Sequence, residues 1–210
     1  GGMITTSRTD WDRKFKLWRH HGMDRPDSAR HNAQQVVFEQ YKDMGFNYRL
    51  TDIQAAVGRE QLKRIPGFID QRRQMGARYK SLLANIPGIA LPVETKWARS
   101  NWQSFCIRLP PDRRQREVMQ IMMERGVATR RGVMNAHEET AYGPNDWSCG
   151  CSKDECHCPP HTCRLLDQSE RAKAECVILP LYHEMTKAEQ DHVVATLVEA
   201  FDRCEQVWLS

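Results

Sequence analysis

The segment 45–52, which reads Gly-Phe-Asn-Tyr-Arg-Leu-Thr-Asp, holds residue types that bind an anion. Asn47 and Arg49 stand directly before a helix start, because Thr51 followed by Gln54 forms a capping box. A helix N-terminus offers backbone N–H groups and the positive end of the helix dipole, and a guanidinium beside it adds a two-pronged donor. The segment therefore predicts a phosphate site. The alternative is that Asn47 serves a turn and Arg49 forms a surface ion pair.

A second group of reactive side chains is a cysteine-rich stretch in the C-terminal third. It contains five of the eight cysteines, with His157 and His161 between them, and the candidate metal ligands are Cys149, Cys151, Cys156, Cys158, His161 and Cys163. Closely spaced thiolates and imidazoles suit tetrahedral zinc, although the C-x-C pairs are tighter than the usual spacing. One interpretation is a structural zinc that holds the loop 149–163, and free thiols or disulfides are the alternatives. The other three cysteines are predicted to be small buried side chains: Cys106, Cys176 and Cys204.

The anion site would be positioned by two helices. The first begins at the Thr51 capping box and has apolar residues at helical spacing: Ile53, Ala56, Val57, Leu62 and Ile65. Pro66 suits the first turn of the second, whose core-facing stripe is Phe68, Met75, Tyr79, Leu82 and Ile86. Basic residues on both helices indicate either a solvated face or nucleic-acid binding, and we favour the solvated face because the aromatic residues serve the core.

The stretch before these helices is less regular. We expect a strand at residues 2–6 and a helix capped by Asp10 that ends at Gly22. Between Met23 and Lys42 the pattern is polar, with at most a short strand at 36–38. These elements and the two helices make up a first domain, 1–90.

The residues after Leu91 predict a small α+β domain, 91–210. Alternation over 104–109 indicates a half-buried strand, and the helix that follows ends at Gly126. Two more strands are expected at 127–129 and 176–181. Thr186 with Glu189 forms a capping box that opens a last helix, whose apolar face is Val193, Val194, Leu197, Phe201 and Cys204.

The composition is that of a globular protein. Of the 210 residues, 40% are hydrophobic and 28% charged, which excludes wholesale disorder. Lys and Arg number 31 against 27 Asp and Glu, and this excess of +4 is spread along the chain, so it does not indicate a nucleic-acid partner. No run approaches the ~20 apolar residues of a membrane span. We expect a cytoplasmic protein that binds neither a membrane nor nucleic acid.

Four stretches resemble the sugar aminotransferases of the DegT/StrS family, which are pyridoxal-phosphate enzymes. They are Gly-Gly-Met-Ile-Thr-Thr at 1–6, Arg-His-His-Gly-Met at 19–23, the segment 45–58 and Leu-Pro-Leu-Tyr-His-Glu-Met-Thr at 179–186. The resemblance spans nearly the whole chain and is most specific at 45–58. It implies an α/β fold: the C-terminal part of a PLP-dependent transferase of the aspartate-aminotransferase type (fold type I), with the end of the large domain and the small domain.

The resemblance also implies an enzymatic activity, and it implies that the catalytic lysine lies outside this sequence. In such enzymes the lysine that forms the Schiff base with pyridoxal phosphate precedes the two glycines by about ten residues, so we expect it upstream of Gly1. The chain alone would then contain no catalytic residue and be inactive. The reaction implied is transfer of an amino group from an amino acid, commonly glutamate, to a keto-sugar nucleotide.

Further residues gain roles from the resemblance. Asn47 and Arg49 match a segment that helps bind the cofactor phosphate of the neighbouring subunit, which implies a homodimer with shared active sites. His21, Arg130 and His137 match positions near the substrate, although His21 could instead interact with a helix dipole. The cysteine-rich loop departs from the family pattern. The alternatives are a zinc-stapled, non-catalytic interaction domain and a non-aminating, dehydratase-like family member.

Overall fold

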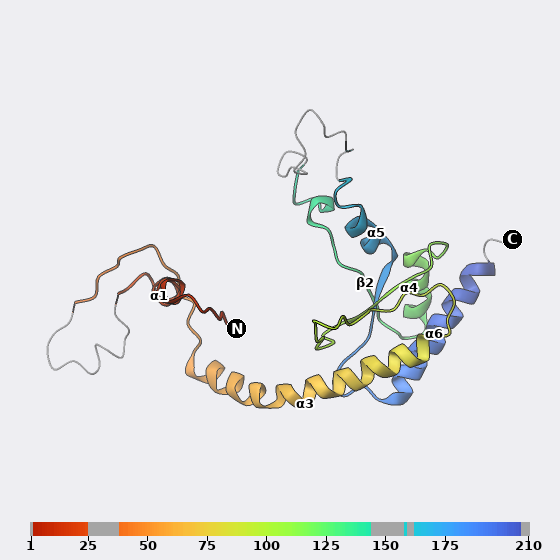
Figure 1. Cartoon of the computed structure of the whole chain (residues 1–210), viewed down its shortest axis with the longest axis horizontal. Coiled ribbons are helices and arrows are strands. Elements are labelled where there is room, and N and C mark those ends of the chain that lie inside the picture. The colour runs from red at the N-terminus through yellow and green to blue at the C-terminus, as the bar shows by residue number, and fades with distance from the viewer. Residues whose placement is uncertain (1, 25–37, 144–157, 159–161, 207–210) are drawn as a thin grey trace. The chain divides into compact units, whose positions relative to one another are not determined.

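The computed structural model describes residues 2–24, 38–143, 158 and 162–206 (Figure 1). The chain divides into two compact units, Gly1–Ile65 and Pro66–Ser210. The first unit contains α1 (Thr9–Trp18) and the beginning of α3 (Asp52–Leu83), and the second contains the rest of α3 and the strands β1, β2 and β3. The predicted boundary at residue 90 lies beyond the end of α3, and that division into domains stays a prediction.

Helix α1 begins one residue earlier than Asp10. Its N-cap residue is Arg8, and no side chain caps the helix. Asp10 lies in the first turn and accepts hydrogen bonds from the Arg8 guanidinium at 3.2 and 2.7 Å, so the prediction that Asp10 caps the helix was wrong. The glycine stop is confirmed: Gly22 has φ +74° and donates its N–H to the carbonyl of Leu17 at 2.9 Å.

Helix α3 is a single helix, whereas the sequence predicted two. The capping box is confirmed, because Thr51 N–H donates to Gln54 Oε1 (3.0 Å) and Gln54 N–H to Thr51 Oγ1 (3.3 Å). Pro66 lies inside the helix. A proline removes one N–H of the helical ladder, and here the capped first half and the buried residues of the second half maintain the helix on both sides.

The apolar stripe predicted for the first half of α3 is exposed in this chain. Its exposed fractions are 79% for Ile53, 57% for Val57, 54% for Leu62 and 41% for Ile65. Residues 2–6 also differ from the prediction, since they form no strand and their backbone groups pair in no ladder of the described chain. The strand considered at 36–38 falls on residues 36 and 37, which lie outside the described residues, and Phe38 is not in a strand.

The second unit is built on a three-stranded antiparallel sheet with strand order β1-β3-β2. β1 (Phe105–Arg108) and β3 (Cys176–Leu179) confirm the predicted strands and pair with Phe105 opposite Leu179. β2 is Arg130–Arg131, not 127–129. The reason is that Val127 N–H still closes the end of the preceding helix on the Met122 carbonyl (2.9 Å), so the chain reaches β3 only at Arg130.

Two predicted helices pack with this sheet. α4 (Gln115–Glu124) ends before Gly126, whose φ is +79°, and packs against α6 and the strands β2 and β3 (Figure 1). α6 (Lys187–Gln206) begins at the predicted capping box, where Thr186 N–H donates to Glu189 Oε2 at 2.7 Å. The core joins α4, α6, β1, β3 and the end of α3: Tyr79, Leu83, Phe105, Ile107, Val118, Met122, Val177, Leu179, Val193 and Leu197.

Two short elements were not predicted. The 3₁₀ turn η1 (Ala136–Glu138) and helix α5 (Asp167–Glu175) lie on either side of the cysteine-rich stretch in sequence. α5 has no buried residue and hence no apolar stripe from which its period could be read. Within the described part of the chain, no helix combines the length and the apolar character that crossing a membrane requires.

Candidate functional site

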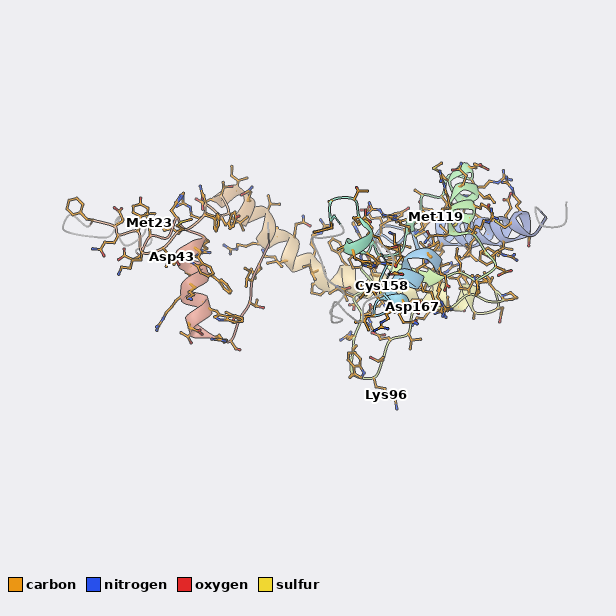
Figure 2. All side chains as sticks on the ribbon, turned by 90° about the horizontal axis from the view of Figure 1, so that it is seen from above. Met23, Asp43, Lys96, Met119, Cys158 and Asp167 are labelled. Atoms are coloured by element: carbon orange, nitrogen blue, oxygen red, sulfur yellow. The ribbon has the colours of Figure 1, made fainter. Side chains whose placement is uncertain are left out.

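Two glycines bring the end of α1 against the segment 43–48. A Cβ at Gly22 would lie 1.8 Å from the carbonyl oxygen of Asp43, and a Cβ at Gly45 would lie 2.1 Å from the backbone nitrogen of Gly22. Asp43 stands beside α1 (Figure 2) and accepts a hydrogen bond from Trp18 Nε1 at 2.6 Å. That N–H and the N–H of Met44 hold the pKa of Asp43 below its usual range. Gly22 and Gly45 therefore allow the backbone after α1 to lie directly against the backbone of the segment 43–48.

The close approach lets two backbone stretches pair. His21 N–H donates to the carbonyl of Phe46, and Tyr48 N–H donates to the carbonyl of Arg19, both at 3.0 Å. His20 and Asn47 form the antiparallel bridge between them. His21 has φ +58°, a left-handed conformation that is uncommon for a side-chain-bearing residue. The histidine pair is thereby held next to the segment that the sequence predicted to bind phosphate.

Arg49 is the centre of a side-chain cluster that we call the Arg49 cluster: His20, His21, Asn47 and Arg49. The Nε of Arg49 donates to Asn47 Oδ1 at 3.0 Å. Its Nη1 contacts His20 Nδ1 at 2.9 Å, and its Nη2 contacts His21 Nε2 at 3.4 Å. A guanidinium only donates, so both ring nitrogens accept. His20 and His21 are then neutral rings of opposite tautomer, with the hydrogen on Nε2 and on Nδ1 respectively.

The Arg49 cluster has the properties of an anion site. Asn47, His20 and His21 contact the Arg49 guanidinium and fix the direction in which it points. Arg49 is exposed and lies just before the N-terminus of α3. An oriented guanidinium at that place fits a phosphate group. The structure thus brings together three predicted site residues, Asn47, Arg49 and His21, and adds His20, which is 8% exposed. The His-His-Gly sequence was the signal that could have found His20.

The second unit carries another exposed cation. Arg130 and Arg131 form β2 and both are exposed. Arg131 Nη2 pairs with Glu139 Oε1 at 3.2 Å. The side chain of Arg130 makes no hydrogen bond or ion pair with the residues that the structure describes. Of the two adjacent arginines, it is therefore Arg130, the predicted substrate-binding residue, whose guanidinium is available for an anion.

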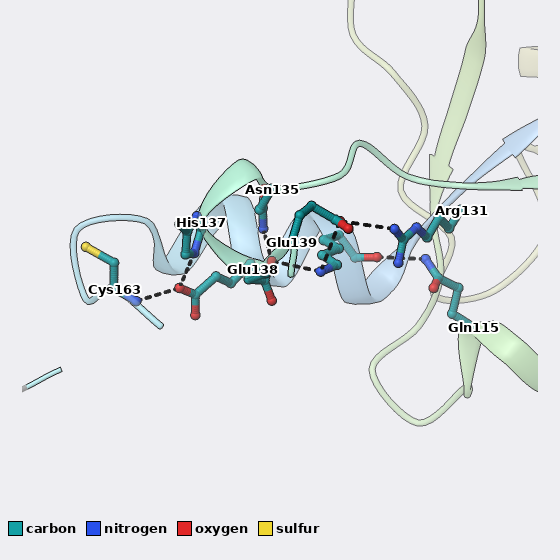
Figure 3. A network of polar contacts seen from close by, with 9 residues as sticks. Gln115, Arg131, Asn135, His137, Glu138, Glu139 and Cys163 are labelled. Carbon is teal, nitrogen blue, oxygen red and sulfur yellow. Dashed lines mark hydrogen bonds and ion pairs between the residues drawn. The ribbon is translucent and has the colours of Figure 1, made fainter. Parts of the chain in front are cut away.

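His137 is buried rather than open. It lies in η1 with 7% of its surface exposed, and its Nε2 contacts Glu170 Oε1 on α5 at 2.9 Å (Figure 3). The same Glu170 oxygen accepts the backbone N–H of Cys163 at 2.6 Å. Sequence reasoning missed Glu170, because a single glutamate in a polar helix carries no pattern. The position of His137 shows a contact within the protein, and its predicted role in substrate binding stays a prediction.

A second polar link joins η1 to α5. Lys173 Nζ lies 3.2 Å from Glu138 Oε2, and Asn135 Nδ2 donates to the same oxygen at 2.6 Å (Figure 3). Partial burial raises the pKa of Glu138, but the donors on Asn135 and Lys173 outweigh it and hold that pKa below its usual range. Gln115 Nε2 in turn donates to the carbonyl of Lys173 at 2.9 Å. η1, α5 and α4 are therefore connected by ionised or hydrogen-bonded side chains.

The proposed metal ligands fall mostly outside the described residues. Cys149, Cys151, Cys156 and His161 lie there, whereas Cys158 Sγ accepts the backbone N–H of Arg164 at 3.3 Å and Cys163 is 2% exposed. Among the residues that are described, no group of three or more His, Cys, Asp and Glu could hold a metal ion. The structural zinc has no support from the described residues and remains a hypothesis from the sequence.

Residues 1–198 match the sequence profile of the DegT/DnrJ/EryC1/StrS aminotransferase family. The chain belongs to this family. This match confirms the family that the sequence predicted from the segment 45–58 and the three supporting stretches, and it covers almost the entire sequence. The match includes the Arg49 cluster, Arg130 and His137.

Solved structures of DegT/DnrJ/EryC1/StrS aminotransferases share the fold. The aminotransferase TlmJ from Streptoalloteichus hindustanus superimposes with a TM-score of 0.73 at 20% identity, over 94% of this chain and 46% of that one. PseC of Helicobacter pylori, an aminotransferase involved in pseudoaminic acid biosynthesis, gives 0.73 at 18% identity, over 94% and 48%. The putative sugar aminotransferase Spr1654 from Streptococcus pneumoniae, in its apo-form, gives 0.75 at 17% identity, over 99% and 48%.

These likenesses establish the fold class. The chain has the mixed α/β fold of the matching part of PLP-dependent sugar aminotransferases, as the sequence predicted. It spans slightly less than half the length of the structures it matches. Spr1654 is also known in a PLP-form and a PMP-form, which the chain matches with TM-scores of 0.72.

Proposed function

We propose that this chain is the C-terminal part of a PLP-dependent aminotransferase that moves an amino group from an amino acid to a keto-sugar nucleotide. Glutamate is the proposed donor. The observation that carries the proposal is the Arg49 cluster, an oriented and exposed guanidinium in the segment 45–58, which lies within the family match. The partial coverage of the related structures supports the further proposal that the lysine partner of the cofactor lies upstream of Gly1 and that the chain alone is inactive.

Asn47 and Arg49 would hold the cofactor through its phosphate. Arg49 supplies the charged donors, while Asn47, His20 and His21 fix the direction in which its guanidinium points. Pyridoxal phosphate, when bound, supplies the electron sink for amino transfer, and the protein supplies binding and orientation. The part played by this chain is thus to fix the anionic end of the cofactor.

The sugar nucleotide would be held by the second unit. Arg130 is an exposed guanidinium without a partner among the described residues, and guanidinium groups recognise diphosphates through paired hydrogen bonds. His21, in the Arg49 cluster, and His137, in η1, are the further residues proposed to border the substrate. The chain would act as a cytoplasmic protein with small-molecule substrates.

A homodimer with shared active sites is the proposed assembly. Phe46 and Tyr48 stack with ring centroids 5.1 Å apart and are 56% and 73% exposed, and the apolar residues Ile53 and Val57, which follow them in the sequence on α3, are exposed as well. An apolar surface of this kind is typical of an interface with another chain. It includes the segment 45–58, which in the proposed dimer would reach the partner's cofactor.

The cofactor proposal is tested by comparing pyridoxal phosphate with pyridoxal, which lacks the phosphate. We expect the chain to bind pyridoxal phosphate at least about tenfold more tightly, and Arg49→Gln to remove this preference. Arg59→Gln, which removes an exposed cation of α3, is the control and should retain it. Equal binding of the two compounds by the unchanged chain would contradict the phosphate site.

The enzymatic proposal needs a separate experiment. A polypeptide that carries this chain and the segment encoded upstream should form 2-oxoglutarate from glutamate when keto-sugar nucleotides are added, whereas the chain alone should not. Borohydride treatment of the chain with pyridoxal phosphate should leave no cofactor on its lysines. A stoichiometric covalent cofactor on one lysine of this chain would overturn the proposed upstream position of the catalytic lysine.

A further inference from the structure

Glu170 joins two residues that are distant in sequence. Its Oε1 lies 2.9 Å from His137 Nε2 and 2.6 Å from the backbone nitrogen of Cys163. Both partners are buried, with 7% of His137 and 2% of Cys163 exposed. They precede and follow the segment 138–162, which contains the cysteine-rich stretch except Cys163 itself. One carboxylate therefore fixes both ends of that segment on α5 (Figure 3).

The carboxylate also determines the state of the His137 ring. A carboxylate oxygen accepts hydrogen bonds, so His137 Nε2 must carry the hydrogen that it shares with Glu170. The hydrogen bond sets both the tautomer and the orientation of the imidazole. Lys173, one turn further along α5, holds Glu138 at 3.2 Å, so α5 fixes two consecutive residues of η1.

We propose that Glu170 is a positioning residue for the sugar-nucleotide site, which orients His137 and holds the backbone at Cys163. The proposal rests on the proposed function, because it takes His137 and Arg130 to face the substrate. Glu170 itself touches neither substrate nor cofactor. It acts through the imidazole of His137 and the backbone at Cys163, both of which would move if the carboxylate were removed.

The positioning role is tested by nuclear magnetic resonance on Glu170→Leu and on the isosteric Glu170→Gln. Glu175→Gln is the matched control, since Glu175 lies on the same helix and pairs with Arg171 (2.9 Å) instead. We expect the neutral His137 ring of the unchanged protein to carry its hydrogen on Nε2, and the Cys163 amide to exchange about tenfold faster in Glu170→Leu but not in Glu175→Gln. A His137 hydrogen on Nδ1, or equal exchange in all variants, would overturn the positioning role.

The substrate part is tested by titrating dTDP-glucose and UDP-glucose into the same proteins. Glu170→Leu should weaken binding of whichever sugar nucleotide binds by about tenfold, Glu170→Gln less, and Glu175→Gln not at all. If Glu170→Leu and Glu175→Gln weakened sugar-nucleotide binding equally, Glu170 would only stabilise the fold, and the proposal would be overturned. If the unchanged protein bound neither compound, the proposed substrate class would fail, and the resonance experiment would still decide the contact of Glu170 with His137.

Discussion

Arg73 binds Glu94 with both ends of its guanidinium. Nη1 lies 2.9 Å from Glu94 Oε1 and Nη2 lies 3.2 Å from Oε2, and Ser100 N–H donates to Oε1 at 2.6 Å. Arg73 Nη1 also donates to the Ser100 carbonyl. These contacts join α3 to both ends of the loop 94–100, whose middle carries the 88% exposed Trp97. The loop between α3 and β1 is therefore closed at its base by a half-buried ion pair.

The closure of this loop should depend on pH. The hydrogen bonds from Arg73, and then from Ser100 N–H, hold the pKa of Glu94 below its usual range. A carboxyl group whose pKa is lowered by folding stabilises the fold above its unfolded pKa, and this contribution is lost as the pH falls through the folded value. Glu94→Gln should therefore lower the thermal midpoint at neutral pH, and the difference from the unchanged protein should shrink below about pH 4. Glu60→Gln, at an exposed pair with Lys63, is the control; a difference that grew in acid would contradict the assignment.

The core of the second unit depends on a buried hydroxyl. Tyr79 is fully buried, and its hydroxyl donates to the carbonyl of Pro180 at 2.8 Å. Burial raises the pKa of Tyr79 far above its usual range. Tyr79→Phe should lower the free energy of unfolding by about 1–2 kcal/mol, because the Pro180 carbonyl loses its donor. Urea unfolding measures this, and Tyr182→Phe, at a 42% exposed tyrosine that donates to Glu189, should change stability by less than about 1 kcal/mol. Equal effects of the two substitutions would contradict the argument.

Local sequence signals predicted the elements that depend on neighbouring residues. The capping boxes at Thr51 and Thr186 begin α3 and α6 as expected, since each needs only two residues three positions apart. Pro66 misled the prediction, because its effect on a helix depends on what holds the helix on both sides. The strand predicted at 127–129 lies instead at Arg130–Arg131, because its position is set by pairing with β3, which is distant in sequence.

The candidate site shows the same division. Asn47 and Arg49 were found from their place before a capped helix. The partners of Arg49 were not all found, since His20 reaches it only through the close approach of Gly22 and Gly45. Sequence spacing carries no information on such a contact.

The close approach itself can be tested with one methyl group. A Cβ at Gly45 would lie 2.1 Å from the Gly22 nitrogen, and both partners are backbone, so the two segments must separate. Gly45→Ala should destabilise the first unit by about 2 kcal/mol or more and lower its affinity for pyridoxal phosphate to the level of Arg49→Gln. Gly58→Ala is the control, because no atom beyond the backbone of its own helix would lie within 4 Å of the added methyl group, and alanine favours a helix. Unchanged phosphate preference in Gly45→Ala would show that the Arg49 cluster forms without the close approach.

Of the three isolated cysteines that the sequence predicted to be buried, Cys204 is buried, whereas Cys106 and Cys176 are half-buried at the paired strands β1 and β3. Cys106 should still be separable from the cysteine-rich loop by its reactivity. Burial, and then the neighbouring Cys176 thiol, raise the pKa of Cys106 from 9.0 to about 11. At about pH 8 the thiolate fraction then falls about a hundredfold, and the thiolate is the reactive form. Iodoacetamide should therefore label Cys106 about a hundred times more slowly than an exposed thiol, as peptide mass spectrometry can measure. Rapid labelling of Cys106 in the folded protein would contradict the raised pKa of its thiol. Because Cys106 is labelled slowly, the same experiment tests the zinc hypothesis: bound metal predicts that Cys149, Cys151 and Cys156 are labelled only after chelation, whereas free thiols react at once.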